Sequence, residues 1–406
     1  IRTFAVYKSI RVKYYIIFIL LFIAGQSFGQ EGEDKKRYKN LSLSGYMQVR
    51  YNGLYESNPD LSCDQCDKNW GDGSSLSIRR ARLVVSGQIH PRLYIYIQPD
   101  FASAVSSDDK ANFGQLRDAY FDLGIDKENE FRFRVGQSKI PYSFENLQSS
   151  RNRLTLDRND GTNSSFTNER DLGVYFMWAS KRRRELFKQF VDDNLKGSGD
   201  YGVVTFGFSN GQPANTRELN KNKHAILRVA YPFQVKEQLM EGGVFGYSGV
   251  YTMMEKDLSS GIRLENDSRN FIDQRVGAHF VLYPKPFGVQ AEYNIGRGPQ
   301  FNPETQTIET RALNGGYVLV NYKLQLKNQF IFPFVKYHYY NGGKKFEQDA
   351  RSYVVNELNA GIEWQPFKNF EFVAMYSYSD RKYEDLQTMQ NRQFGHSLRF
   401  QVQVLF

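Results

Sequence analysis

The residues of this sequence that could do chemistry are arginines and lysines spaced along two stretches. A guanidinium group offers forked N–H donors that match the oxygens of phosphate or carboxylate, whereas an ammonium group acts as a point charge. Several such side chains around one passage would bind or select anions. The candidates for an anion pathway are Arg80, Arg82, Arg132, Arg134, Lys139, Arg151, Arg153 and Arg158.

Two of these arginines lie in a segment that alternates as a strand does. In the run FRFRVG, which begins at Phe131, apolar residues alternate with Arg132 and Arg134. A period of two predicts a β-strand with one apolar and one polar face. Pro141 cannot donate to a sheet ladder, so the strand should end before it. The polar segment 141–168, with three further arginines, is then a long loop that we expect to fold inward as a constriction.

A second alternating segment carries the other two arginines. The run SIRRARLVVSGQI, residues 77–89, places Arg80 and Arg82 on its polar face. An arginine that faces lipid at the bilayer midplane costs roughly 2–4 kcal/mol, and less near the interface. We therefore expect Arg80 and Arg82 to face a lumen. Arg79 shares the apolar face near the outer end of the strand, from which it should reach the membrane interface.

Lumen arginines select anions only where carboxylates do not neutralise them. If the two kinds of residue pair, the lumen carries a transverse field without a net preference. The arrangement of the basic residues, more than the bulk charge, favours net anion selection. The carboxylates that could neutralise them are Asp118, Asp122, Glu292 and Glu363.

Alternating segments recur along the chain and predict an all-β protein. A sixteen-stranded antiparallel transmembrane barrel would leave a water-filled lumen, whereas eight strands would fill with side chains. A soluble β-sandwich is the alternative. The expected strands lie near 41–52, 76–89, 93–101, 115–125, 131–140, 170–179, 201–210, 224–232, 243–252, 273–283, 288–296, 313–324, 330–340, 355–365, 370–379 and 392–406.

The lengths of the gaps favour the barrel over the sandwich. Short turns alternate with long loops such as 297–312, 341–354 and 380–391. Short periplasmic turns and long extracellular loops are typical of outer-membrane barrels, and a sandwich has no reason to sort its loops in this way. The last strand alternates to Phe406. It should close the barrel against 41–52, and it looks like the signal read by the barrel assembly machinery.

The N-terminal residues and the composition indicate export. Residues 1–29 have basic residues and then an apolar run of 11 residues, 14–24, which predicts a signal peptide; an N-terminal membrane anchor is the alternative. Residues 30–40 read as a periplasmic lead, and 41–406 as the barrel. Aromatic residues make up 15% of a sequence that is only 40% hydrophobic. The predicted location is the outer membrane of a Gram-negative bacterium, in contact with its lipid.

The net charge and the cysteines exclude other classes. The formal charge of +9 falls to +5 without the four basic residues of the signal, which argues against a nucleic-acid partner. Cys63 and Cys66 have no histidine nearby, so we expect no metal and no cofactor, and leave open whether they form a disulfide. The gap 180–199 is too long for a turn. It predicts an amphipathic helix and reads either as a solvated insertion, the favoured interpretation, or as a basic patch that collects anions.

Enzymatic and adhesive functions have little support in the sequence. The five histidines are scattered, and neither a GxSxG nor an HExxH motif is present, so we expect no enzyme. A structural or adhesin barrel without specific transport remains an alternative, as does a general or weakly selective porin. Single-channel conductance distinguishes a channel from a plugged barrel.

Seven segments follow one another through the chain: IRRARLVVSGQI, LRDAYFDLGI, FRFRVGQSKIPYSFENL, RDLGVYFMW, PFGVQAEYNIGRGP, NGGYVLVNYKL and FPFVKYHYYNGG. Together, and in this order, they resemble the phosphate-selective porin O and P family. The resemblance implies a 16-stranded barrel, usually trimeric, with an inward-folded third loop. It also implies an anion path lined by arginines, with lysines near the constriction, onto which Arg80, Arg82, Arg134 and Lys139 map. The expected function is therefore passive diffusion of anions, phosphate or polyphosphate, through a homotrimer.

Overall fold

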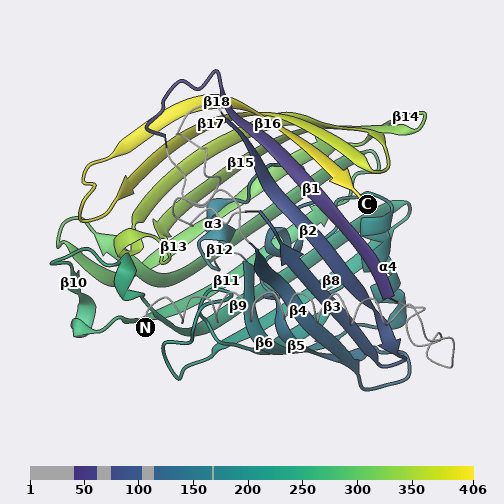
Figure 1. Cartoon of the computed structure of the whole chain (residues 1–406), viewed down its shortest axis with the longest axis horizontal. Helices are drawn as coiled ribbons and strands as arrows, with labels where there is room; N and C mark the ends of the chain where they lie inside the picture. The colour runs from purple at the N-terminus through teal and green to yellow at the C-terminus, as the bar shows by residue number, and fades with distance from the viewer. Residues whose placement is uncertain (1–40, 62–74, 103–113, 167–168) are drawn as a thin grey trace, which may run out of the picture.

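The computed structural model describes residues 41–61, 75–102, 114–166 and 169–406. The predicted signal peptide, the periplasmic lead, Cys63 and Cys66 lie outside these residues. Eighteen strands form one sheet in the described part of the chain, and sixteen of them make the wall of a barrel (Figure 1). The other two are β10 (Arg263–Leu264), which pairs in parallel with β13, and β14 (Leu324–Leu326), which prolongs β13 along β15.

The wall strands follow the expected order, and each pairs antiparallel with its neighbours. Their pairing confirms the predicted sixteen-stranded antiparallel barrel. They are β1 (Leu41–Leu54), β2 (Ser75–His90), β3 (Leu93–Asp100), β4 (Gln115–Gly124), β5 (Phe131–Lys139), β6 (Arg170–Trp178), β7 (Val204–Ser209), β8 (His224–Val235), β9 (Gln238–Thr252), β11 (Asn270–Leu282), β12 (Phe287–Asn302), β13 (Thr307–Tyr322), β15 (Gln329–Gly343), β16 (Ser352–Phe367), β17 (Phe370–Glu384) and β18 (Arg392–Leu405).

The barrel is closed by the first and last strands. β1 pairs with β18, from Tyr46 opposite Leu405 to Tyr51 opposite Phe400, as the sequence predicts. Closure gives every wall strand two partners and leaves no open edge, as a membrane-spanning sheet requires. None of the helices in the described segments is both long and apolar enough to cross a membrane.

Side chains alternate between an apolar outer face and a polar inner face. In β8, Leu227, Val229 and Tyr231 are exposed, whereas His224 and Arg228 are fully buried. The outer face suits lipid, and the buried polar face points into the lumen. The remaining elements are the helices α2 (Phe144–Leu147), α3 (Asp160–Asn163) and α4 (Lys181–Asp192), and the 3₁₀ turns η3 (Glu255–Asp257), η4 (Glu265–Asp267) and η5 (Gln348–Ala350).

One predicted connection is wrong, and another is confirmed in part. Residues 297–312 are not a long loop, because β12 and β13 stay paired up to Asn302 opposite Thr307. The glycines and proline of this stretch obscure its alternation in the sequence. The insertion 180–199 contains the predicted amphipathic helix, whose charged residues are mostly exposed to solvent. Its helix α4 buries Phe187 and Phe190, which are three residues apart on one helical face, against Tyr283 at the short-turn end (Figure 1).

Gly136 changes the direction of β5 just before the inward loop. Its φ is +126°, in the region that favours glycine, and it lies opposite Tyr120 of β4. A Cβ at this position would lie 2.3 Å from the carbonyl oxygen of Ala119. After Gly136 the strict alternation ends, and Gln137, Ser138 and Lys139 are all buried. The loss of alternation after Gly136 explains why Lys139 faces inward, although strict alternation would place it on the same outer face as Val135.

Gly136→Ala is expected to reduce the yield of assembled barrel, because the substitution combines an unfavourable φ with a backbone clash. A strained φ alone costs about 1–3 kcal/mol. The measurement is the heat-modifiable fraction on unboiled gels. Gly261→Ala is the matched control, since Gly261 also has a positive φ but a Cβ there meets nothing within 4 Å. Equal loss in both variants would contradict the role given to the close approach at Gly136.

Candidate functional site

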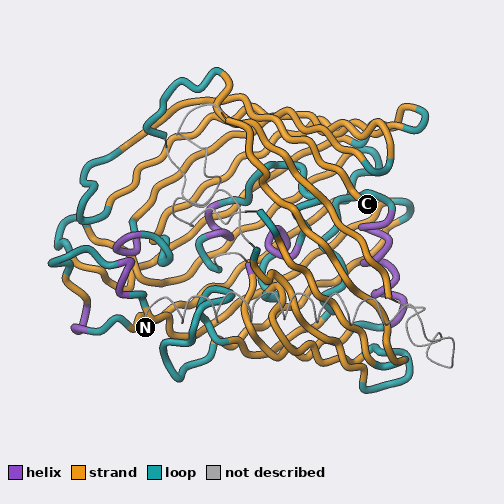
Figure 2. The backbone as a smooth tube through the Cα atoms, viewed as in Figure 1, coloured by secondary structure: helices purple, strands orange, loops and turns teal. Residues whose placement is uncertain are grey.

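The segment between β5 and β6 runs inside the barrel and reaches its far wall. The short helices α2 and α3 lie within the lumen (Figure 2), and α3 contacts β12, β13 and β15. Glu145 of α2 accepts a hydrogen bond from Lys336 of β15. Asp160 of α3 lies 2.7 Å from Lys344 and 3.1 Å from His338. All five side chains are almost fully buried, so the segment is fixed by ion pairs rather than by loose contact.

A third ion pair holds the middle of this segment. Asp157 lies between Arg50 of β1, at 3.1 Å, and Arg399 of β18. Arg50 also donates to the backbone oxygen of Leu156 at 3.0 Å. The two guanidinium groups are 0% and 1% exposed. Residues 156–157 are therefore attached to the two strands that close the barrel.

The charges around the inward segment change the titration of its carboxyl groups. Burial alone would raise the pKa of Asp157, but Arg399 and Arg50 hold that pKa far below its ordinary value. The pKa of Asp160 is likewise lowered, against the effect of burial, chiefly by Lys344. A depressed pKa keeps a carboxylate ionised through the range near pH 4 in which free Asp and Glu titrate. These attachments are therefore lost only at lower pH, once the folded-state pKa is crossed.

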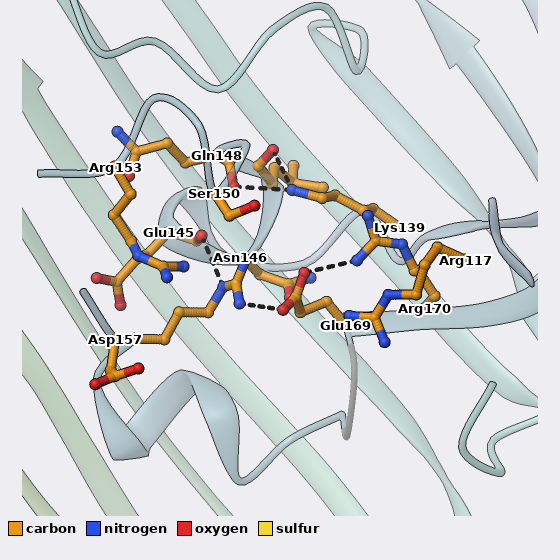
Figure 3. Close-up of polar contacts among 12 residues, drawn as sticks. Arg117, Lys139, Glu145, Asn146, Gln148, Ser150, Arg153, Asp157, Glu169 and Arg170 are labelled. Atoms are coloured by element: carbon orange, nitrogen blue, oxygen red, sulfur yellow. Dashed lines mark hydrogen bonds and ion pairs between the residues drawn. The ribbon is translucent and has the colours of Figure 1, made fainter. Parts of the chain in front are cut away.

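Basic residues of the wall and of the inward segment meet at one place, the constriction cluster. It comprises the cations Arg80, Arg82, Arg117, Lys139, Arg153, Arg158 and Arg170 and the three carboxylates Asp100, Asp118 and Glu169. Ser150 brings the inward segment to the wall, since its hydroxyl lies 2.7 Å from that of Tyr46 and its carbonyl accepts from Gln48 at 3.2 Å. Figure 3 shows the part of the cluster around Glu169.

Glu169 is shared by two arginines of the constriction cluster. Arg158 and Arg170 both donate to its carboxylate, the latter at 2.8 Å. Burial would raise the pKa of Glu169, but these two guanidinium groups hold it well below its ordinary value. Arg170 also makes three hydrogen bonds of 3.0 Å to Asp118. Arg158 and Arg170 are therefore neutralised in part by shared carboxylates.

Three other cations of the constriction cluster, Arg80, Arg153 and Lys139, form no ion pair with a carboxylate among the described residues, and a fourth, Arg117, forms only a long one. Arg80 donates to the side-chain oxygen of Gln48 at 2.8 Å, and its Nε is buried without a partner. Arg153 donates to two carbonyls of its own segment, and its Nη1 is buried without a partner. Lys139 donates to the carbonyls of Leu147 and Gln148 at 3.0 and 2.8 Å. Arg117 lies 4.0 Å from Asp100.

The structure separates the eight predicted pathway residues. Arg80, Lys139, Arg153 and Arg158 meet in the constriction cluster, together with Arg82, which pairs with Asp100 at 2.7 Å. Arg134 is held in a fork by Asp122 at 2.8 and 2.9 Å. Arg132 is neutralised by Asp200 at 2.9 Å, and Arg151 is exposed. Strand parity predicts that these side chains face the lumen but does not predict their partners.

Four arginines that face the lumen were not predicted, and a fifth faces the lumen although it was expected to face lipid. Arg50 and Arg399 lie on predicted polar faces, so strand parity could have identified them. Arg117 occupies a register shift between β3 and β4, and Arg170 has the parity of the lipid face although it points inward. Arg79, expected on the lipid face, falls in a bulge of β2, and its Nε is buried. A bulge changes the face without leaving a signal in the alternation.

The predicted neutralising carboxylates mostly do pair with cations. Asp118 pairs with Arg170, Asp122 with Arg134 and Glu363 with Lys196. Glu292 instead accepts the backbone N–H of Phe144 and the hydroxyl of Thr162, at 2.7 and 2.8 Å, and so supports the inward segment. No group of three or more His, Cys, Asp or Glu with metal-site geometry occurs in the part of the chain that the structure describes.

A closed sixteen-stranded barrel with an apolar outer face and an ion-paired segment across its lumen defines an outer-membrane porin. The chain belongs to the phosphate-selective porin O and P family, whose model matches residues 58–406. A porin is a channel rather than an enzyme. Its location is the outer membrane, as the sequence predicts. None of the curated proteins compared with the chain matches it significantly.

Solved structures share the fold at low sequence identity. The outer membrane channel DcaP of Acinetobacter baumannii is 13% identical, with a TM-score of 0.55 over 90% of this chain and 97% of that one. OmpT of Vibrio cholerae, in its trimer form, is 10% identical, with a TM-score of 0.53 over 90% and 99%. An anion-selective porin from Comamonas acidovorans is 9% identical, with a TM-score of 0.51 over 90% and 99%.

Proposed function

We propose that this porin is an anion-selective channel that passes phosphate or another small oxyanion, polyphosphate included, through its constriction cluster. The observation that carries the proposal is the charge balance of that cluster. Its seven cations face three carboxylates, an excess of four positive charges within the described residues. Unneutralised cations in a low-dielectric constriction attract anions and repel cations.

The unpartnered nitrogens support an oxyanion over a halide as the favoured solute. Arg80 and Arg153 each keep one buried N–H without a hydrogen-bond partner in the described part of the chain. Arg80 also feels the positive charges of Arg79, Arg82 and Arg153. Phosphate has several acceptor oxygens and can take forked bonds from two guanidinium groups, whereas chloride accepts without such geometry. The same site would serve the terminal phosphates of a polyphosphate.

Arg80→Lys is expected to keep the chloride conductance and to weaken inhibition of the chloride current by phosphate. Lysine retains the charge but loses the forked donors. A loss of about 1.4 kcal/mol corresponds to a roughly tenfold higher half-inhibitory concentration of phosphate. The measurement is the chloride current in planar bilayers with increasing phosphate. Arg92→Lys, at an exposed turn, is the control.

Reversal potentials under a salt gradient test the proposal directly. An anion-selective wild-type channel supports it. A cation-selective or unselective channel would mean that the carboxylates dominate, and the general-porin alternative would then replace it. A barrel that does not conduct would instead favour the structural or adhesin alternative.

We also propose that the channel assembles as a homotrimer. Support comes from the trimer form described for OmpT of Vibrio cholerae, which shares this fold. Cross-linking in the membrane should give a three-chain product. A cross-linking pattern limited to monomers would contradict this assembly.

A further inference from the structure

The β6–β7 connection, residues 179–203, reaches across the short-turn end of the barrel to the opposite wall. Six wall strands, β8, β9, β11, β12, β13 and β15, separate β7 from β16 in one direction, and seven, β17, β18 and β1–β5, separate β16 from β6 in the other. Asn194 nevertheless donates to the side-chain oxygen of Gln365 on β16 at 2.7 Å. Lys196 forms an ion pair of 2.5 Å with Glu363 of the same strand. The connection therefore spans the lumen, as the inward segment does.

The far end of the β6–β7 connection is held by buried contacts. The side chains of Lys196 and Glu363 are each 1% exposed. The ammonium group of Lys196 lies 4.6 Å from the ring centre of Phe332 on β15. Lys323, between β13 and β14, donates to the backbone oxygen of Asp193 at 2.6 Å. A buried ion pair that loses one partner leaves an uncompensated charge, so this pair fixes the connection against the wall.

The backbone at Lys196 indicates that its side chain is what the position requires. Its φ is +66°, in the left-handed region that favours glycine and that costs free energy for other residues. A glycine here would relieve the backbone, but it could not pair with Glu363. The local strain is therefore offset by the contact that the side chain makes across the lumen.

The β6–β7 connection and the inward segment meet without a gap at their points of contact. Gln148 of the inward segment donates to the backbone oxygen of Lys196 at 2.7 Å. Phe144 of α2 belongs to the same apolar cluster as Phe187 of α4. The backbone oxygen of Gln148 also accepts from Lys139 of the constriction cluster at 2.8 Å. A solute that leaves the constriction cluster must therefore pass around the connection and not between the two segments.

We infer that the β6–β7 connection is a second narrowing of the channel, at its periplasmic exit, and that the ion pair between Lys196 and Glu363 holds it in place. The connection limits the size of the solutes that leave the constriction cluster. This role goes beyond the proposed anion selectivity, because the ion pair is neutral overall and adds no net charge to the passage. The alternative is that the connection only fills space beside the wall and leaves the exit as wide as before.

The double variant Lys196→Gly, Glu363→Gln tests this role without changing the net charge. Glycine suits the φ of residue 196, and glutamine keeps the shape of residue 363. The single-channel conductance in planar bilayers is expected to rise at least about 1.5-fold, since a wider exit lowers the resistance of the pore. The anion-to-cation permeability ratio should stay unchanged.

Neutral polyethylene glycols of increasing mass, added to each side in turn, locate the change. Polymers that the wild type excludes at the short-turn side should enter the double variant and lower its conductance. The size limit at the extracellular side should not change, because the ion pairs of the inward segment remain. A change of equal size on both sides would overturn the inference, since it would mean that the whole lumen had widened.

Lys188→Ala, Asp192→Ala is the matched control. It removes an ion pair of 3.9 Å within α4, whose side chains are 77% and 59% exposed, and it also keeps the net charge. The control should leave the conductance and both size limits as in the wild type, and an equal rise in the control would contradict the role of the buried pair.

Asn194→Gly is a milder variant that keeps the ion pair and removes the hydrogen bond to Gln365. Glycine suits the φ of +54° at this position, so the variant tests the inference even if the double variant does not assemble. It should show the same one-sided change to a smaller extent. Unchanged conductance and unchanged size limits in the assembled variants overturn the second narrowing. An unselective wild-type channel would instead overturn the proposed function and leave this test intact.

Discussion

Replacement of Arg80 and Arg153 together by glutamate is expected to abolish the anion selectivity of the channel. The two changes remove the excess of four positive charges, so the constriction cluster becomes neutral overall. They also place carboxylates where the unpartnered guanidinium nitrogens were. A unit charge about 8 Å from a permeating ion contributes about 2 kcal/mol at an effective dielectric constant of about 20. Reversal at two positions should therefore change the anion-to-cation permeability ratio by more than tenfold.

Reversal potentials at low and high salt measure this change. The effect should be largest at low ionic strength, because screening by salt weakens the field of the cluster. The double variant Arg92→Glu, Lys368→Glu is the matched control, since it changes the net charge equally at two exposed turns. A similar shift in the control would mean that selectivity follows the total charge of the protein and not the constriction cluster.

Asp157→Asn is expected to release the middle of the inward segment and to increase the single-channel conductance. Asparagine keeps the shape of the side chain but leaves the guanidinium groups of Arg50 and Arg399 without their shared carboxylate. Removal of one partner from a buried ion pair costs about 3–5 kcal/mol. Because Glu145 and Asp160 still attach α2 and α3, the barrel should assemble while residues 150–157 gain freedom.

Conductance and phosphate inhibition report different parts of this effect. Arg153 donates to the carbonyls of Thr155 and Leu156 at 3.0 and 2.9 Å, so release of the segment should also weaken inhibition by phosphate. Asp380→Asn, which removes an exposed pair with Arg392, is the control and should change neither property. An unchanged conductance in Asp157→Asn would show that the ion pair does not determine the width of the passage.

The fold could be predicted because lipid imposes one simple rule on the sequence. Every second residue of a wall strand must be apolar, so runs such as 224–231 reveal both a strand and its inner face. The predicted strands of the hairpin β12–β13 were too short, because Gly296, Gly298 and Pro299 interrupt the apolar alternation without interrupting the backbone pairing. Strand existence depends on side chains, whereas strand ends depend on backbone pairing that the sequence does not display.

The site could be predicted only in part, for a related reason. Parity identifies which arginines face inward, but an ion pair depends on register and on segments that meet from distant parts of the chain. Arg134 looks as free as Arg80 in the sequence, yet Asp122 lies directly opposite Arg134 across β4 and β5. The inward orientation of Arg117 could be predicted only with knowledge of a register shift, and that of Arg170 only with knowledge of the bend at Gly136. The neutralised and the free cations therefore became distinguishable only in three dimensions.

The seam between β1 and β18 constrains how this protein can be made. Gly45 and Phe406 exchange backbone hydrogen bonds of 2.8 and 3.1 Å, so residues at the beginning and at the end of the barrel sequence complete one ladder. Until β18 has been synthesised, the backbone groups along one edge of β1 have no partner. Until the chain reaches the membrane, its apolar outer face has no lipid to cover it. Exposed edges and apolar strands aggregate readily, and such distant pairing forms slowly. The nascent chain must therefore be kept unfolded on its way to the membrane, where closure and insertion have to occur together.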